Sequence, residues 1–323
     1  MRISYDPNGI RQITIHMMKK KHLYLFAALF TLGAYLTYEY GTRKAMNATD
    51  EFFLAKIQST LTFNPEYNLE PLPEKDQQEL ACALTQNYTY LGHGGQCFAF
   101  VSEDNRYVLK FLNHSKRRLS FYSSWPLLPT SLQKRINKKT ERKKEKQQRD
   151  FTSYLIAIRD LQEQTGMIFV HLNKTTSLHK TIVITDKKGE HFTIHLDHYE
   201  FLLQKKADNI YNKIRFFMDN SQQAKAESLI DSLITSLIAR SKKSIIDDDA
   251  ILHKNFGCID DKCLFIDVGR FRKDPRIADP TMYIEDIYRI TTPFTRWLKQ
   301  NYSELDIYLD GRIQELRKKS TNA

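Results

Sequence analysis

The order of apolar and polar positions predicts a chain that combines short strands with longer helices. Apolar side chains at helical spacing predict a helix around 229–238, and residues 131–165 form a second helical stretch. Short apolar runs bounded by polar turns predict strands, at 90–101, 107–112, 167–172, 181–185, 191–196 and 201–204, with a short hairpin at 258–266. No repeat of 20 to 50 residues is visible, which argues against solenoids and propellers.

A run without charged residues lies near the N-terminus, at 22–38. As a helix, its 17 residues would be about 25 Å long, at the short end of what a bilayer core requires. Three lysines precede the run and tyrosines lie near its ends, as is typical of membrane interfaces. We therefore expect a retained single-pass transmembrane segment over 22–40, after a basic head over 1–21. A cleaved signal peptide and a buried core helix are the alternatives.

The charges around this run leave open which side of the membrane carries the rest of the chain. Lysines before it and mixed charges after it mildly favour an N-terminus in the cytoplasm. Met1, Met17 and Met18 are all candidate start sites, and the last two would leave a short lysine-rich head. The polar residues 41–87, which contain three prolines, are interpreted as a connector.

Composition and charge restrict the classes of partner. The chain has 323 residues, 41% hydrophobic and 27% charged, which is enough apolar material for a packed core. Its formal net charge of +11 should attract phosphates and other anions. Four cysteines without a CxxC pair argue against a disulfide scaffold or a zinc site. Nine Lys or Arg residues at 134–149 predict a solvated helical face that acidic lipid or an acidic protein could bind; nucleic acid is not an expected partner.

Glycines and a lysine on the predicted hairpin indicate a phosphate site. At Gly92, Gly94 and Gly95 the bare backbone lets N–H groups approach a phosphate closely. Lys110, on the following strand, can pair with phosphate oxygens. This order resembles the nucleotide-binding hairpin of the protein-kinase-like superfamily, G-x-G-x-x-G-x-V followed by a Val-Ala-x-Lys strand. Cys97 stands at the third glycine position of that pattern.

The second half of the chain carries the carboxylate motifs of the same family in the same order. An acidic triplet at 247–249 precedes Asn255, and a short hairpin leads from there to Asp267 in an Asp-Val-Gly motif. In kinases an Asp of this loop is the base, and an Asn and a second Asp hold Mg²⁺. The resemblance implies Asp249, or alternatively Asp247, as the catalytic base, with Asn255 and Asp267 as metal ligands. The chain lacks the family's His-Arg pair, and its Asp249–Asn255 spacing is six positions instead of five.

The resemblance also implies a helix that delivers a carboxylate to Lys110. Glu145 is the first candidate for this carboxylate, and Glu141 and Asp150 are the alternatives. Lys110 and Glu145, together with the three glycines, would then bind ATP.

These features predict an α+β, two-lobed kinase-like fold preceded by one transmembrane helix. Residues 88–208 would form the N-terminal lobe, with the basic helix inserted, and residues 209–323 the C-terminal helical lobe. After Asp267 the chain has 56 residues, so the C-terminal lobe is expected to be minimal. The likeness is distant, that of an atypical bacterial kinase-like protein.

Three functions are consistent with the sequence. The first is a membrane-anchored phosphotransferase that depends on ATP and Mg²⁺ and acts on an unknown acceptor. The second is a pseudokinase for interaction or nucleotide sensing, which the altered loop spacing, the missing His-Arg pair and the short C-terminal lobe favour. The third is a basic membrane-associated binding protein that uses 134–149 and binds no nucleotide. Saturable ATP binding separates the first two from the third.

Overall fold

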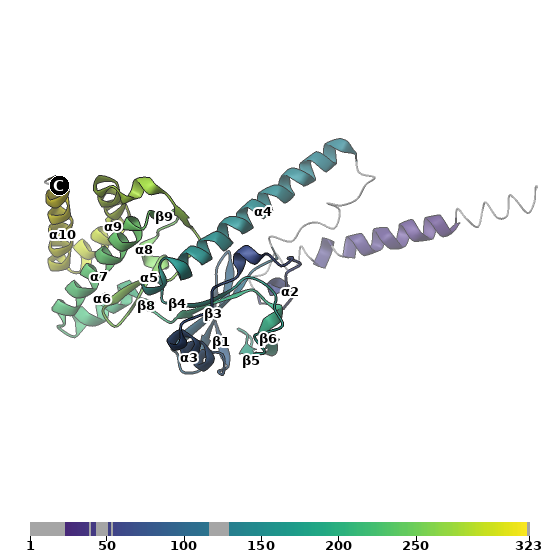
Figure 1. Ribbon diagram of the computed structural model, residues 1–323, viewed down its shortest axis with the longest axis horizontal. Coiled ribbons are helices and arrows are strands. Elements are labelled where there is room, and N and C mark those ends of the chain that lie inside the picture. Colours follow the sequence, from purple (N-terminus) through teal and green to yellow (C-terminus); the bar gives the residue numbers. More distant parts are fainter. Residues whose placement is uncertain (1–22, 39, 43–50, 53, 116–128, 322–323) are drawn as a thin grey trace, which may run out of the picture. The chain divides into compact units, whose positions relative to one another are not determined.

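The computed structural model describes residues 23–38, 40–42, 51–52, 54–115 and 129–321 (Figure 1). Contacts divide the chain into two compact units, Met1–Phe53 and Leu54–Ala323, and each is described by itself. The predicted basic head at 1–21 lies outside the described residues. The predicted connector at 41–87 spans the boundary between the units, and its residues from Leu54 onward belong to the second.

In the first unit, residues 23–38 and 40–42 are helical. Large apolar side chains lie on the surface of this helix; Leu23 and Phe30 expose 66% and 70% of their area. The sequence predicted a transmembrane segment over 22–40. Of the helices in the described part of the chain, none combines the length and the apolar character needed to cross a membrane.

The second unit is built around a curled seven-stranded sheet with the strand order β4-β7-β3-β2-β1-β5-β6. Neighbouring strands are antiparallel, except that β1 and β5 pair in parallel. The strands are β1 (Tyr88–His93), β2 (Cys97–Ser102), β3 (Tyr107–Leu112), β4 (Met167–His171), β5 (Thr181–Thr185), β6 (His191–His195) and β7 (Phe201–Lys205).

The glycine-rich segment differs from its prediction in one respect. The stretch 90–101 was expected to be a single strand, but it contains parts of two, β1 and β2, which pair with each other. The chain reverses between them, and the Gly94 N–H donates to the Cys97 carbonyl oxygen at 2.9 Å across the turn. Gly94 and Gly95 therefore lie at the tip of a hairpin, and Gly92 lies near it at the end of β1.

Helices pack around the sheet and form the C-terminal part of the second unit (Figure 1). They are α2 (Leu54–Ile57), α3 (Glu74–Ala83), α4 (Thr130–Arg159), α5 (Gln162–Thr165), α6 (Ile210–Asp219), α7 (Gln223–Lys242), α8 (Leu252–Asn255), α9 (Pro280–Asn301) and α10 (Ser303–Thr321). The helix predicted within 131–165 is divided, because α4 ends at Arg159 and the short α5 follows. This mixed architecture is compatible with the predicted α+β fold, and the division into lobes after Asp208 stays a prediction.

Two small sheets bring the second-half motifs together. One has the order β11-β10-β8, and in the other β12 pairs with β9. Their strands are β8 (Asp208–Asn209), β9 (Ile245–Asp247), β10 (Phe256–Ile259), β11 (Lys262–Phe265) and β12 (Phe271–Lys273). The predicted short hairpin is confirmed, since Cys258 lies opposite Cys263 and Asp260 has the left-handed φ of 55° that a two-residue turn requires. Both cysteines are free.

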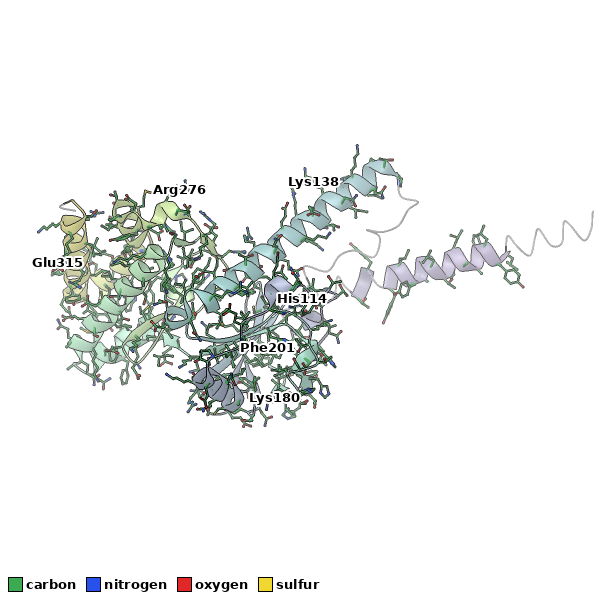
Figure 2. All side chains as sticks on the ribbon, in the orientation of Figure 1. His114, Lys138, Lys180, Phe201, Arg276 and Glu315 are labelled. Carbon is green, nitrogen blue, oxygen red and sulfur yellow. The ribbon has the colours of Figure 1, made fainter. Side chains whose placement is uncertain are left out.

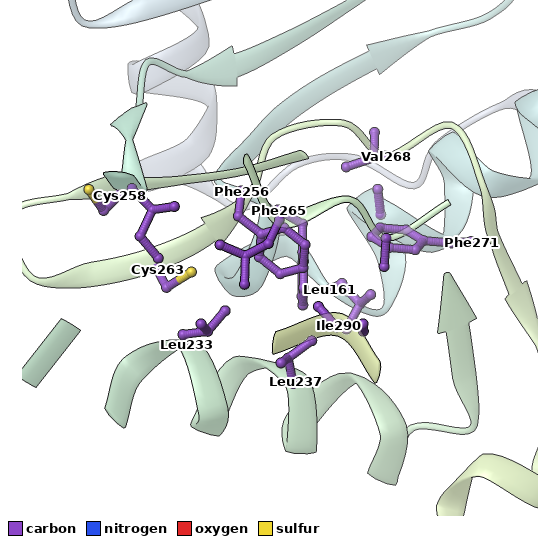
Figure 3. Packing of buried hydrophobic residues seen from close by; sticks show 14 of the residues in the cluster. Leu161, Leu233, Leu237, Phe256, Cys258, Cys263, Phe265, Val268, Phe271 and Ile290 are labelled. Atoms are coloured by element: carbon purple, nitrogen blue, oxygen red, sulfur yellow. The ribbon is translucent and has the colours of Figure 1, made fainter. Parts of the chain in front are cut away.

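This hairpin rests on a core of aromatic and aliphatic side chains (Figure 3). The Phe265 ring packs edge-on against Phe256 at 5.1 Å and against Phe271 at 5.7 Å, measured between ring centroids. Leu233 and Leu237 of α7 lie in the same buried cluster. Because the core holds both strands of the hairpin, Asn255 just before it and Asp267 just after it are held at a fixed separation.

Replacing Gly257 with alanine is expected to lower the free energy of unfolding by about 2 kcal/mol, because overpacking forces backbone shifts. A Cβ there would lie 2.8 Å from the Ala207 Cβ and 2.9 Å from the Asp208 carbonyl oxygen. Gly311 in α10 is the matched control, since a Cβ there meets nothing within 4 Å. The Gly311→Ala change should stabilise the helix. Urea unfolding of both variants checks the prediction, which fails if the two changes have the same effect.

Candidate functional site

A cavity of about 520 Å³ lies between the glycine-rich hairpin and the segment 266–270 that follows β11. Its lining comes from segments that are far apart in the sequence. Gly92, Gly94 and Gly95 contribute from the hairpin tip, Lys110 from β3, and residues 249 and 266–268 from the second half. The cavity therefore brings together most of the residues that the sequence singled out.

The three glycines of the hairpin tip are not required by the packing of the protein. A Cβ at Gly92, Gly94 or Gly95 would meet no atom within 4 Å. None of the three has the positive φ that favours glycine. Bare backbone at these positions does, however, leave room for a ligand to approach the N–H groups closely.

Lys110 lies in the cavity, and its ammonium group is held by neutral partners. The Nζ donates to Gln204 Oε1 at 2.7 Å and to the Ile266 carbonyl oxygen. Burial lowers the pKa of Lys110, and the negative charge of Asp267 opposes that shift. Gln204, which the sequence analysis missed, donates in turn to the carbonyl oxygens of Thr165 and Phe265.

The prediction that Glu145 pairs with Lys110 is wrong. Glu145 is exposed on α4 and lies outside the cavity lining. The physical reason is the rotation of α4 about its own axis. Glu145 lies on the exposed side of the helix, and the buried residues begin further along, at 150 and 151. There Asp150, one of the two alternatives, is fully buried and accepts from Arg270 Nη1 at 2.9 Å. The other alternative, Glu141, is exposed like Glu145.

Helix α4 also contacts the Asp-Val-Gly segment and the hairpin tip. The Ser153 hydroxyl donates to the Val268 carbonyl oxygen and accepts from the Phe271 N–H at 2.6 Å. The Tyr154 hydroxyl donates to Gln96 Oε1 at 3.1 Å. Gln96 Nε2 lies 3.4 Å from the Gly269 carbonyl oxygen. Gln96 therefore bridges the hairpin tip, α4 and the Asp-Val-Gly segment.

The glycine of the Asp-Val-Gly motif is required by this bridge. An added Cβ on Gly269 would lie 1.8 Å from Gln96 Oε1. Sequence reasoning could have found Gln96 only as a polar residue beside the glycines. Its contact with Gly269 joins positions 173 residues apart, and that follows from the tertiary structure alone.

Asn255 connects the acidic loop to the segment that carries Asp267. Its Nδ2 donates to the Asp249 carbonyl oxygen. Its own carbonyl oxygen accepts from the Ile266 N–H at 2.8 Å and, more weakly, from the Asp267 N–H at 3.5 Å. Asp249 and Asp267 line the cavity, and the buried Asn255 lies between their backbones.

The side-chain oxygens of Asn255 and Asp267 are of the kind that Mg²⁺ prefers. Among the described residues, Asn255 Oδ1 accepts no hydrogen bond, and the Asp267 carboxylate accepts one, from the Gly269 N–H at 3.3 Å. The described part of the chain contains no cluster of three or more His, Cys, Asp or Glu that could hold a metal ion. The donor chemistry of these two residues suits such a cation, but only Asp267 lines the cavity, and Asn255 lies outside the lining.

Asp247, the alternative catalytic base, is 2% exposed and lies outside the cavity lining. Its Oδ1 accepts from the Asp249 N–H at 3.0 Å, so it shapes the loop that carries Asp249. Burial raises the pKa of Asp247 to about 6. Of the two candidates, Asp249 is the one whose side chain is exposed to the cavity.

The raised pKa of Asp247 predicts a pH-dependent stability. Between its ordinary value near 3.8 and about 6, the folded protein holds a proton that the unfolded chain has released. Proton binding by the folded protein therefore stabilises it less as the pH rises. The free energy of unfolding should fall by about 1 kcal/mol from pH 5 to pH 7. Urea unfolding at both pH values should show that Asp247→Asn removes this change. Asp248→Asn, at an exposed neighbour, is the control, and an equal change in both variants would contradict the assignment.

Two of the solved structures that resemble the chain are only distantly similar to it. No protein family and no curated protein matches the chain. A structure of WbdD with the kinase inhibitor LY294002 is 14% identical, with a TM-score of 0.29, and the match covers 71% of this chain. The Rv3197–erythromycin complex from Mycobacterium tuberculosis is 14% identical, with a TM-score of 0.30, and covers 88% of this chain and 74% of that one. The chain spans 45% of the WbdD structure, less than half its length.

Proposed function

We propose that this protein is a kinase-like phosphotransferase that binds ATP with Mg²⁺ in the cavity beside its glycine-rich hairpin. One observation carries the proposal: the cavity lining joins the glycine-rich tip, Lys110, Asp249 and Asp267. These residues come from a hairpin tip, a sheet strand, the loop after β9 and the segment after a second hairpin, and motifs in this order resemble those of kinases.

The charge of the cavity suits a polyphosphate. Its lining contains five basic side chains and two acidic ones, Lys110, Lys205, Lys206, Lys254 and Arg270 against Asp249 and Asp267. Lysine ammonium groups bind phosphate oxygens as point charges, and backbone N–H groups at the glycines can donate to them. The proposed role of Lys110 is to hold the phosphates, and that of the hairpin tip is to cover them.

The acidic residues would carry the chemistry. Asn255 and Asp267 would hold Mg²⁺, which neutralises charge on the transferred phosphate. Asp249, exposed in the cavity, would accept or orient the proton of the acceptor hydroxyl. Asn255 keeps these groups in register, because it contacts the backbone of both Asp249 and Asp267. Transfer of a phosphoryl group needs mainly positioning and charge stabilisation, which this arrangement can supply.

Calorimetric titration of the full chain with ATP, with and without Mg²⁺, tests the proposal. We expect saturable binding that requires Mg²⁺. Lys110→Met should weaken it by roughly tenfold to a hundredfold, because a charged hydrogen bond of about 1.5–3 kcal/mol is lost. Asp267→Asn should remove most of the dependence on Mg²⁺. Gly94→Val should fold normally, since its Cβ meets no atom within 4 Å, and yet bind ATP poorly.

Lys242→Met is the matched control for Lys110→Met. Lys242 is exposed at the end of α7 and lies outside the cavity lining. The control should bind ATP like the wild type. An absence of binding at millimolar ATP, in protein that unfolds cooperatively, would exclude both the enzyme and the nucleotide-sensing function.

The partners of Lys110 favour a second candidate function, that of a pseudokinase. Among the described residues, Lys110 Nζ contacts an amide and a carbonyl oxygen instead of a carboxylate. Gln96 also ties the hairpin tip to Gly269. A domain that binds nucleotide without turnover would keep the ATP affinity described above. A rate measurement separates the two functions.

A further inference from the structure

The N-terminal half of α4 carries a row of basic side chains on one side of the helix. Arg135 is followed by basic residues at positions i+3, i+4, i+7, i+11 and i+14, which a helix places on one face. This basic face comprises Arg135, Lys138, Lys139, Arg142, Lys146 and Arg149, and all six are exposed. At about 1.5 Å per residue the row is roughly 21 Å long.

The rotation of α4 is fixed by its other side. Residues at the spacing i, i+3, i+7, i+10 and i+14 are half-buried, and these are Gln133, Ile136, Thr140, Lys143 and Gln147. Further along, residues 150 and 151 and 153–158 are buried in the core. The two acidic residues of the stretch, Glu141 and Glu145, lie beside the basic face and not within it. The same helix is therefore anchored at one end and presents cations to solvent at the other (Figure 2).

We propose that the basic face of α4 docks on the anionic headgroups of a membrane surface. Exposed charges that are held in a row on a rigid helix can all approach a flat surface of opposite charge together. Each Lys or Arg near such a surface adds to binding within a Debye length, about 8 Å at physiological salt. No residue of 130–149 is aromatic, so the surface lacks the stacking groups typical of proteins that bind single-stranded nucleic acid.

The first unit supplies an independent reason to choose lipid. Its helix exposes large apolar side chains, among them Leu25 at 58%, Phe26 at 70% and Leu29 at 59%. Stable attachment to a bilayer usually needs two signals, an apolar one and a polybasic one. The chain carries one of each, in separate units. The inference does not depend on nucleotide binding and stands or falls apart from the proposed function.

Flotation of the full chain with vesicles tests the proposal. The two vesicle types are phosphatidylcholine alone and phosphatidylcholine with phosphatidylserine. We expect tighter binding to the anionic vesicles, with an advantage that shrinks as salt is raised. In the variant Lys138→Gln/Arg142→Gln/Lys146→Gln, the affinity for anionic vesicles relative to neutral ones should fall by about a hundredfold, because three cations at the surface are removed. Its binding to neutral vesicles should not change. Glutamine keeps the helix propensity, so the variant should fold.

A charge-matched control is Lys299→Gln/Lys318→Gln/Lys319→Gln, at exposed positions of α9 and α10. It should keep the preference for anionic vesicles. The proposal is overturned if the wild type binds both vesicle types equally, or if the control loses as much as the α4 variant. Duplex DNA or RNA that binds the basic face more tightly than the anionic vesicles at physiological salt would assign this face to nucleic acid instead. ATP binding by the α4 variant should equal that of the wild type.

Discussion

Replacing Asp286 with alanine is expected to lower the free energy of unfolding by about 3–5 kcal/mol, since it leaves a buried charge without its partner. Asp286 on α9 accepts from Arg240 Nη2 of α7, and Arg240 is 0% exposed. Two other nitrogens of Arg240, Nε and Nη1, have no hydrogen bond among the described residues. The guanidinium also lies 5.7 Å from the centroid of the Phe265 ring. The ion pair thus links α7 and α9, next to the β10–β11 hairpin that leads to Asp267.

The double variant Arg240→Met/Asp286→Leu tests whether the loss of stability comes from leaving Arg240 without its partner. Replacing both partners with apolar side chains removes two desolvated charges, so it should recover most of the lost stability. Glu285→Ala on α9 is the control, because Glu285 and its partner Arg317 are 64% and 39% exposed and pairs of this kind contribute under about 1 kcal/mol. Urea unfolding monitored by circular dichroism gives all three values. A loss below about 1 kcal/mol for Asp286→Ala would show that Arg240 finds another partner.

Replacing Asp249 with asparagine is expected to reduce phosphoryl transfer by about 10²–10⁴-fold, the usual contribution of a general base. The affinity for ATP with Mg²⁺ should stay close to that of the wild type, because asparagine keeps the shape of the side chain. The backbone contact of Asp249 with Asn255 would also remain, since it uses the Asp249 carbonyl oxygen. Release of phosphate from ATP, or labelling of the protein with γ-labelled ATP, measures the rate.

Asp248 provides the control within the same acidic triplet. Its carboxylate pairs with Arg272 Nε at 3.0 Å and lies outside the cavity lining. Asp248→Asn should therefore keep the wild-type rate. If the wild type binds ATP but shows no turnover above the Asp249→Asn variant, the protein is a pseudokinase and the catalytic assignment fails.

Several features of the site could be predicted because they depend on short stretches of chain. The separation of Asn255 and Asp267 has little freedom, because a short hairpin joins them. Asp260 and Asp261 form its two-residue turn, with paired strands on either side. Lys110 could be placed for the same reason, because alternating apolar positions around a polar turn define the β2–β3 hairpin. The reversal of the chain at the glycines, between β1 and β2, was not predicted. The basic stretch at 134–149 was recognised from its charge alone.

The choice between Asp247 and Asp249 needed the three-dimensional structure. Both are acidic residues of one loop. The sequence placed Asp249 first and Asp247 second, and neither has the family spacing of five positions to Asn255. In the fold, Asp247 ends β9, which pairs with β12, and its side chain is buried near Arg240 and Asp267. Asp249 lies beyond the strand, and there its side chain reaches the cavity. Strand pairing decides which of two nearby carboxylates is buried and which faces the cavity.

The sequence by itself determined the hairpins, the helical stretches and the residue types that could bind a phosphate, because local hydrogen bonding and apolar periodicity depend on neighbouring positions. Tertiary structure alone decided which residues surround Lys110. Glu145 was chosen from its place in a helix, but the buried side chains at 151 and 153–158 set the rotation of α4. That rotation turns Asp150 and Tyr154 inward instead. The packing of helix against sheet involves residues far apart in the chain, so no local pattern could encode it.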